Sequence, residues 1–243
     1  INPFNVENWE NLADAYQKAA IIYITQDQKD KALELISKSQ EIFSKISQYN
    51  RKAPKNAREK LEVTSELMLY MYKSKLLAEN IDDDNYHKKL DKLVFASDFT
   101  VDADNDGVPD LWRISNSPKG LLEVNIEKEA VQIINKGEGP SYFNLKKDIT
   151  LLPKKSYTVN LFIEGKSSEN SPILNVLSRK GQNLQHQLNN IILGLELANI
   201  SSTFVTTEDI EDGTQWLRMD ITGNMEDVVF VKGVEVWLEH IER

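Results

Sequence analysis

The 243-residue chain contains no cysteine, three histidines and no glycine before Gly107. The absence of cysteine excludes disulfide bonds and cysteine-ligated zinc. The histidines at 87, 186 and 240 have no spacing typical of a zinc hydrolase or a catalytic triad, and no G-x-S-x-G or H-E-x-x-H motif occurs. The acids between Glu208 and Asp212 lie in a largely polar stretch that is expected to be a solvated loop, where little would raise a carboxyl pKa. The sequence therefore predicts that this chain is not an enzyme.

Long apolar runs are also absent. The longest helical candidate, residues 19–24, is far shorter than the roughly 20 residues that span a bilayer. A signal peptide is not visible, and because the chain begins with Ile1 we expect a fragment or a processed product. We expect no membrane insertion by this segment.

Positive charge is scarce in the second part of the chain. Residues 1–96 hold 15 basic and 15 acidic side chains, whereas residues 97–243 hold 14 basic and 23 acidic ones and carry the whole net charge of −9. Such a surface repels phosphate backbones and anionic lipid. We therefore expect neither nucleic acid nor a membrane surface as a partner.

The first part of the chain has a helical pattern from Val6 to about Glu79. Apolar residues recur every three to four positions, and the lack of glycine favours helix throughout. Asn5 is expected to cap the first helix, Asp27 or Asp30 to open the second, and Pro54 to open a third that ends near Asn80. The sequence predicts antiparallel helical hairpins over residues 1–80, followed by a linker at 81–93.

Four residues near the start follow the W-x2-L-[GA]-x2-Y spacing of one repeat type: Trp9, Leu12, Ala13 and Tyr16. This segment resembles a tetratricopeptide repeat, preceded by the Asn2-Pro3 that closes such units. The likeness implies a helical repeat that can bind a protein partner. A generic helical hairpin is the alternative interpretation.

From about Leu93 the pattern changes to short β-rich runs separated by Gly, Pro, Asn and Asp, which predicts an antiparallel β-sandwich over residues 94–243. The predicted strands cover residues 121–126, 130–134, 156–163, 173–177, 216–221 and 228–238. The segment 188–200 suits either a strand or a helix. The overall prediction is a multidomain α + β chain.

An Asp-rich loop lies at the start of this second part and predicts a Ca²⁺ site. Asp102, Asp104 and Asp106 occupy loop positions 1, 3 and 5, Gly107 takes the sharp turn, Val108 offers its carbonyl, and Asp110 binds through water. Position 12 is Arg113, so the bidentate Glu of an EF-hand is missing and the loop is expected to be structural. An Asp-rich turn without metal is the alternative. A weak ligand set of this kind fills at extracellular calcium levels, which favours an extracytoplasmic location.

Four motifs of the second part occur in the order found in one family: Asp98-Phe99, then residues 107–112 (GVPDLW), 153–159 (PKKSYTV) and 230–236 (FVKGVEV). Over residues 94–243 the chain resembles jelly-roll carbohydrate-binding modules of families 4, 9 and 22. The chain departs from the family where Lys155 replaces a turn glycine and where Lys232 and Gly233 replace two acids that often help to bind structural calcium. The resemblance implies a non-catalytic, sugar-binding sandwich whose calcium is held by the loop itself, with Asp98 as the nearest further ligand.

Sugars are bound by exposed aromatic rings with amides and carboxylates around them. Trp237 is predicted to point outward because it alternates with Val234 and Val236, and Tyr142, near a strand start, is the second candidate ring. Trp112 is expected either to contact sugar or to pin the calcium loop, and Trp216 is expected in the core. Gln185 represents an amide-rich stretch that contacts sugar or is only a solvated loop.

These observations favour a glycan-recognition module with structural calcium, attached to a helical repeat and acting outside the cytoplasm in polysaccharide recognition or assembly. Its partner is expected to be a polysaccharide or an oligosaccharide. The alternative is a protein-interaction scaffold in which the helices bind a partner and the sandwich is a spacer. The start of the chain also resembles the tail of bacterial membrane proteins of the O-antigen ligase or polymerase type. No transferase residue follows from that likeness.

Overall fold

The computed structural model describes most of the chain. The described residues are 6–52, 64–83, 85–99, 101–102, 106–116, 122–127, 130–136, 141–145, 149–166, 173–178, 198–206, 208, 215–221 and 228–239. The chain divides into two compact units. The first comprises Ile1–Ser97 with Asp102–Asp106, and the second comprises Asp98–Val101 with Gly107–Arg243.

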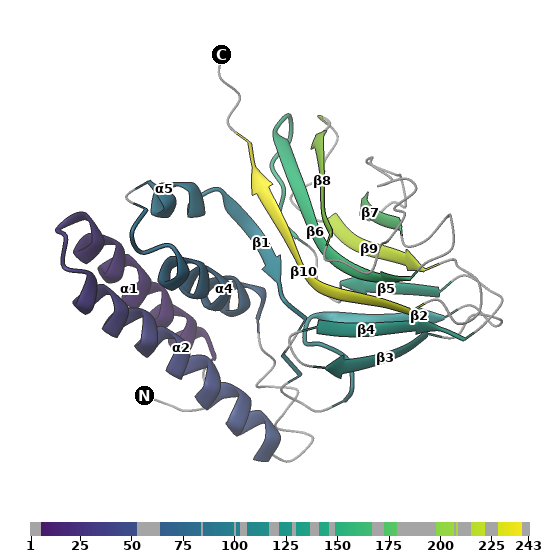
Figure 1. Cartoon of the computed structure of the whole chain (residues 1–243), viewed down its shortest axis with the longest axis horizontal. Helices are drawn as coiled ribbons and strands as arrows, with labels where there is room; N and C mark the ends of the chain where they lie inside the picture. The colour runs from purple at the N-terminus through teal and green to yellow at the C-terminus, as the bar shows by residue number, and fades with distance from the viewer. Residues whose placement is uncertain are drawn as a thin grey trace. The chain divides into compact units, whose positions relative to one another are not determined.

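The first unit is helical. Its elements among the described residues are α1 (Val6–Thr25), α2 (Lys29–Lys52), α4 (Ser65–Glu79), α5 (Tyr86–Leu90) and the strand β1 (Leu93–Ser97) (Figure 1). Helix α1 packs against α2, and α4 packs against both. The fully buried Ala13, Ala20 and Ala32 let the backbones approach closely. The predicted helices are confirmed, whereas the tetratricopeptide assignment stays a prediction.

The helix ends differ in part from the prediction. Asp27, with φ of 55°, lies in the turn between α1 and α2, and α2 begins at Lys29. The predicted opening of a third helix at Pro54 lies outside the described residues. Helix α4 is capped by Thr64, whose Oγ1 accepts the Leu67 N–H at 3.3 Å. The segment 81–93, expected as a linker, contains α5 and the start of β1.

A buried polar cluster joins the three long helices. Gln17 Nε2 donates hydrogen bonds to Ser74 Oγ at 2.6 Å and to the Tyr70 carbonyl, and Ser74 Oγ donates to Ser39 Oγ at 3.2 Å. Gln17, Ser39 and Ser74 are all buried. Buried polar groups are tolerated when they are bonded in this way, and such a cluster favours one helix register over others.

The second unit is an antiparallel β-sandwich, as predicted (Figure 1). One sheet has the order β3-β4-β10-β6-β8. Its strands are β3 (Leu122–Glu127), β4 (Ala130–Asn135), β10 (Val228–Leu238), β6 (Ser156–Lys166) and β8 (Ala198–Val205). The other sheet has the order β2-β5-β9-β7. Its strands are β2 (Trp112–Asn116), β5 (Ser141–Leu145), β9 (Gln215–Ile221) and β7 (Ile173–Ser178). Residues 198–200 of the ambiguous segment are therefore strand.

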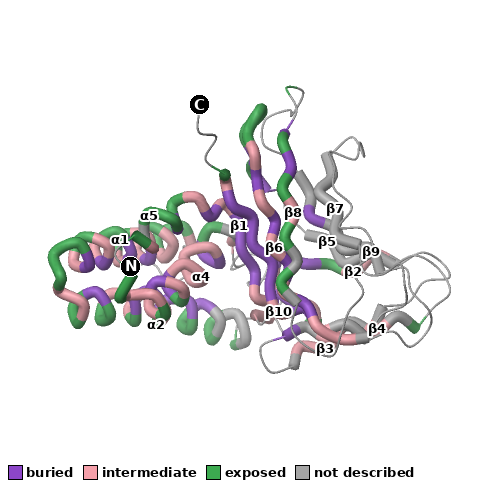
Figure 2. The backbone as a smooth tube through the Cα atoms, turned by 45° about the horizontal axis from the view of Figure 1, so that its top comes forward, coloured by how far each residue is buried: buried purple, intermediate pink, exposed green. Residues whose placement is uncertain are grey.

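Each sheet contributes one apolar face to the core. Leu161 and Ile163 of β6 and Val236 of β10 are fully buried on one side, as are Trp112 of β2 and Leu217 of β9 on the other. Figure 2 shows that β10 is buried along most of its length. Two sheets whose inner faces alternate with outer positions along each strand are the usual construction of a sandwich.

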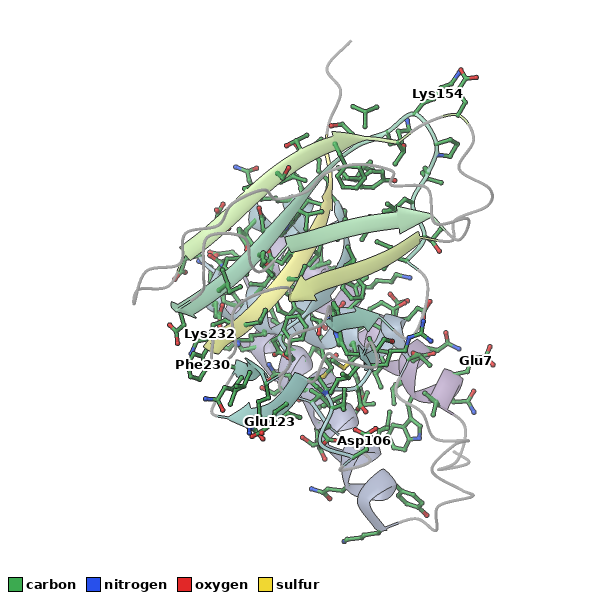
Figure 3. All side chains as sticks on the ribbon, turned by 90° about the vertical axis from the view of Figure 1, so that its right-hand side faces the viewer. Glu7, Asp106, Glu123, Lys154, Phe230 and Lys232 are labelled. Carbon is green, nitrogen blue, oxygen red and sulfur yellow. The ribbon has the colours of Figure 1, made fainter. Side chains whose placement is uncertain are left out.

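The longest strand pair, β6 with β10, contains a β-bulge. The register shifts between Val231 and Gly233, so Lys232 is the extra residue. Lys232 Nζ lies 3.3 Å from Glu164 Oε1 of β6. Figure 3 shows Phe230 and Lys232 close together at one end of this pair and Lys154 near the other.

Among the described helices, none combines the length and the apolar character that a membrane crossing requires.

Candidate functional site

The sheet β2-β5-β9-β7 has one core face, and the strand register shows which residues share the opposite one. Trp112 and Leu217 are 0% exposed, whereas Arg113, next to Trp112, is exposed. Successive residues of a strand lie on opposite faces, and directly paired residues lie on the same face. We call the face opposite Trp112 and Leu217 the Arg113 face. Its polar and aromatic positions are Arg113, Ser115, Tyr142, Asn144, Asn175, Trp216, Arg218 and Asp220.

The register arranges these positions in rows across the strands. The central row pairs Arg113 with Asn144, Asn144 with Arg218 and Arg218 with Asn175. Two residues further along each strand, Tyr142 lies opposite both Ser115 and Asp220, and Asp220 pairs with Ile173.

A third row lies on the other side of the central one. It contains Trp216, which pairs with Leu177. Tyr142 and Trp216 stand on adjacent strands and four residues apart, so their Cα atoms are roughly 14 Å apart. Two aromatic positions therefore flank a row of guanidinium and amide positions.

Tyr142 is thus the one predicted sugar-contacting ring that the register places on this face. The register places Trp216 on this face as well, opposite the buried Leu217, whereas the sequence predicted Trp216 in the core. Sequence reasoning also missed Arg113, Arg218 and Asn144. The signal was present in β9, where Trp216, Arg218 and Asp220 alternate with Leu217, Met219 and Ile221.

Trp112 does not offer a ring to solvent. It is 0% exposed, and its ring lies 4.8 Å from that of Phe99, tilted by 45°. Two roles were expected for Trp112. Contact with sugar is wrong, because the ring is buried. The packing against Phe99 agrees with the other role, in which Trp112 holds the loop in place.

Trp237 is buried as well, at 9% exposure, so its predicted outward position in solvent is wrong. The predicted alternation itself holds, since Glu235 and Trp237 share the face opposite Val234 and Val236, but both faces of β10 are buried here. The indole Nε1 donates to Glu235 Oε2 at 2.8 Å.

Glu235 links this tryptophan to the neighbouring strands. Asn160 of β6 donates to Glu235 Oε2 at 3.3 Å, and Ser201 of β8 donates to Asn160 Oδ1 at 2.8 Å. A buried carboxylate is stabilised when several donors surround it. Trp237 is therefore part of a structural network across three strands. Gln185, the fourth predicted sugar residue, lies outside the described residues.

The Asp-rich loop has the turn geometry that its sequence predicts. The Asp106 backbone N–H donates to Asp102 Oδ1 at 3.1 Å, and Asp106 is exposed (Figure 3). Gly107 has φ of 82°, a conformation that favours glycine. Next to it, the Asp110 N–H donates to the Val101 carbonyl at 2.6 Å, and Trp112 N–H donates to the Pro109 carbonyl at 3.0 Å.

The donor chemistry of the loop fits calcium, because carboxylate and carbonyl oxygens are its preferred ligands. Asp98, Asp102, Asp106, Val108 and Asp110 are described, whereas Asp104 is not. Within the described residues, no group of three or more His, Cys, Asp or Glu side chains is close enough to hold a metal ion.

The acids near residue 208 were expected in a solvated loop. Glu208 is exposed and forms an ion pair with Lys154, which precedes β6. An exposed, paired carboxylate of this kind is a poor general acid, because nothing desolvates it.

No protein-family model matches the sequence, and no curated protein matches it. Solved structures show likeness at low identity. One described as "CBM4 structure and function" has a TM-score of 0.44 and 16% identity, over 53% of this chain and 86% of that one. The CBM22-1 xylan-binding domain of Xyn10C from Paenibacillus barcinonensis has a TM-score of 0.41 and 8% identity, over 62% and 96%. The enzymatically active domain of bacteriophage CBA120 tailspike protein 4 has a TM-score of 0.42 and 9% identity, over 58% and 22%. Binding modules and an enzyme domain thus share the same low level of likeness.

Proposed function

We propose that this chain is a non-catalytic glycan-binding protein whose β-sandwich binds sugar on the Arg113 face. The observation that carries the proposal is the strand register, which puts Tyr142 and Trp216 on the same face as the exposed Arg113. The motif likeness of residues 94–243 to carbohydrate-binding modules supports the same function.

The residue types of this face suit a chain of sugar rings. An aromatic ring stacks on the apolar face of a pyranose, while amide, guanidinium and carboxylate groups bond the surrounding hydroxyls. Tyr142 and Trp216 are separated by roughly 14 Å along and across the strands, so a single monosaccharide does not reach both. The expected ligand is therefore an oligosaccharide or a polysaccharide.

Calcium has a separate, structural role in this proposal. The loop 102–110 binds one ion through its carboxylates and the Val108 carbonyl, with Asp104 completing the set and Asp98 as a further ligand. Such a site fills at the millimolar calcium found outside cells, which supports an extracytoplasmic location. When bound, the ion neutralises the clustered acids, and the loop's own residues fix the start of the sandwich.

Affinity electrophoresis of the whole chain against a panel of soluble polysaccharides tests the function. We expect at least one polysaccharide to retard the protein, and we expect Tyr142→Ala and Trp216→Ala each to weaken that binding by about tenfold or more, the loss typical of an aromatic anchor. Tyr49→Ala is the matched control, because Tyr49 is an exposed ring, 41% accessible, on α2.

Circular dichroism of each variant checks that it folds. Two results contradict the proposal: no retardation anywhere in a broad panel, or unchanged binding by both folded ring variants.

A further inference from the structure

The central row of the Arg113 face contains two arginines. The sequence has net charge −9, and the row pairs Arg113, Asn144, Arg218 and Asn175 in succession. Resting on the proposed function, we infer that the bound glycan is acidic, and that its ligand class is a uronate-containing oligosaccharide whose carboxylates are held by Arg113 and Arg218.

Geometry supports this ligand class. Arg113 and Arg218 are separated by one intervening strand, which places their Cα atoms about 9.5 Å apart. This spacing is close to the length of a disaccharide unit, so a sugar chain lying across the strands presents a carboxylate to each arginine when every second ring is a uronate. Asn144 stands between the two arginines and can bond the hydroxyls of the ring that lies there.

The residue type is informative as well. A guanidinium matches a carboxylate with two parallel hydrogen bonds, whereas an ammonium acts as a point charge. Neutral sugars need donors and acceptors in equal measure, and amides supply both. Two arginines in one row, each paired with asparagines, therefore indicate recognition of carboxylate rather than of hydroxyl alone.

The net charge of the chain disfavours densely charged polyanions as ligands. A net charge of −9 repels a dense polyanion over long range. Asp220, on the row beside Arg218, adds one negative charge to the face itself. A chain with one carboxylate per disaccharide meets little of this repulsion, whereas a heavily sulfated polysaccharide or a nucleic acid meets much more. Short-range bidentate pairing, and not long-range attraction, then provides the preference.

Isothermal titration with two matched probes tests the inference. The first is an oligosaccharide that alternates uronate and neutral sugar. The second is the same oligosaccharide after reduction of its carboxylates to alcohols. We expect the acidic probe to bind at least about tenfold more tightly. Arg113→Gln and Arg218→Gln should each remove most of that preference, because each variant weakens binding of the acidic probe by a larger factor than binding of the reduced probe.

Two further variants separate geometry from charge. Arg218→Lys keeps the positive charge but loses the two parallel N–H donors of the guanidinium, so we expect it to retain only part of the preference for the acidic probe. Lys88→Gln removes one positive charge from the exposed surface of α5 and should leave both affinities unchanged.

Each outcome bears on one claim. Equal affinity for the two probes, or tighter binding of a sulfated polysaccharide, overturns the acidic ligand class and leaves glycan binding intact. Binding of neutral polysaccharides alone does the same. Failure to bind any glycan in the panel overturns the proposed function itself.

Discussion

Phe99 and Trp112 lie with their ring centroids 4.8 Å apart, one before and one after the Asp-rich loop. Both are 0% exposed. Phe99 has φ of 60° and Leu111, beside Trp112, has φ of 70°, so both ends of the loop use a backbone conformation that side chains disfavour. Such a conformation costs of order 1–3 kcal/mol and persists only where packing enforces it. The ring pair is the packing that holds the loop ends.

Truncation of Phe99 should therefore destabilise the sandwich strongly. We expect Phe99→Ala to lower the free energy of unfolding by about 3–5 kcal/mol, as for other buried aromatic residues. Three of the four tryptophans, Trp112, Trp216 and Trp237, lie in the second unit, so urea unfolding followed by tryptophan fluorescence measures this loss. Val205→Ala, at a side chain that is 60% exposed, should change stability by less than about 0.5 kcal/mol. A loss under about 1 kcal/mol for Phe99→Ala would show that the ring pair does not hold the loop.

Calcium should stabilise the same unit. A ligand at about 100 times its Kd raises the free energy of unfolding by about 2.7 kcal/mol. We expect the fluorescence-detected melting temperature to rise in calcium and to fall in chelator, with the helical signal in far-UV circular dichroism unaffected. Asp104→Asn should weaken the response strongly, because Asp104 at loop position 3 is one of the expected carboxylate ligands. The same melting curve in calcium and in chelator would refute the metal site.

The buried Gln17–Ser74 hydrogen bond predicts non-additive effects in the helices. Gln17→Leu leaves the Ser74 hydroxyl without this 2.6 Å donor, and the loss should be about 1–3 kcal/mol. The double variant Gln17→Leu, Ser74→Ala should lose less than the sum of the two single variants, since removing both partners leaves fewer unsatisfied groups. Urea unfolding followed by far-UV circular dichroism gives the coupling, with Lys45→Gln as an exposed control. Strict additivity would mean that the cluster does not act as a unit.

Lys73 of α4 should make the free energy of unfolding depend on pH. Burial lowers its pKa from the ordinary 10.5, and nearby Asp91 and Asp14 only partly oppose this effect. The unfolded chain therefore holds this proton more tightly than the folded one, and stability rises with pH between the lowered folded pKa and about 10.5.

Lys73→Met removes that penalty. We expect the variant to be more stable than the wild type at neutral pH and the difference to shrink as the pH rises toward 10.5. Urea unfolding at neutral and alkaline pH measures it. A difference that does not vary with pH would assign the effect of the substitution to packing alone.

The sequence predicts the kinds of element well, because the relevant signals are local. The helices α1, α2 and α4 are predicted by the absence of glycine and by apolar residues that recur every three to four positions. The strands β6, β9 and β10 are predicted by the alternation of apolar and polar residues. The strands β2 and β5 were not among the predicted ones, because polar residues interrupt their few apolar residues.

Burial depends on what covers a face, which alternation along one strand does not reveal. Trp237 was placed on the correct face of β10, yet that face is covered and carries the buried Glu235. Trp216 was placed in the core by analogy, although its neighbour Leu217 fills that position. The Arg113 face combines four strands that are far apart in sequence, so only the register brings its residues together.

The β-bulge at Lys232 determines which side chains of β10 share a face. Val231 and Val234 are both 0% exposed although they are three positions apart, because Lys232 is an extra residue between them. Deletion of Lys232 would shift the register of one half of the strand and would exchange its two faces, either from Gly233 onward or from Val231 back. A one-residue deletion at this point is therefore equivalent to replacing several core side chains of the strand at once. Substitution of Lys232 by another polar residue leaves the strand register unchanged.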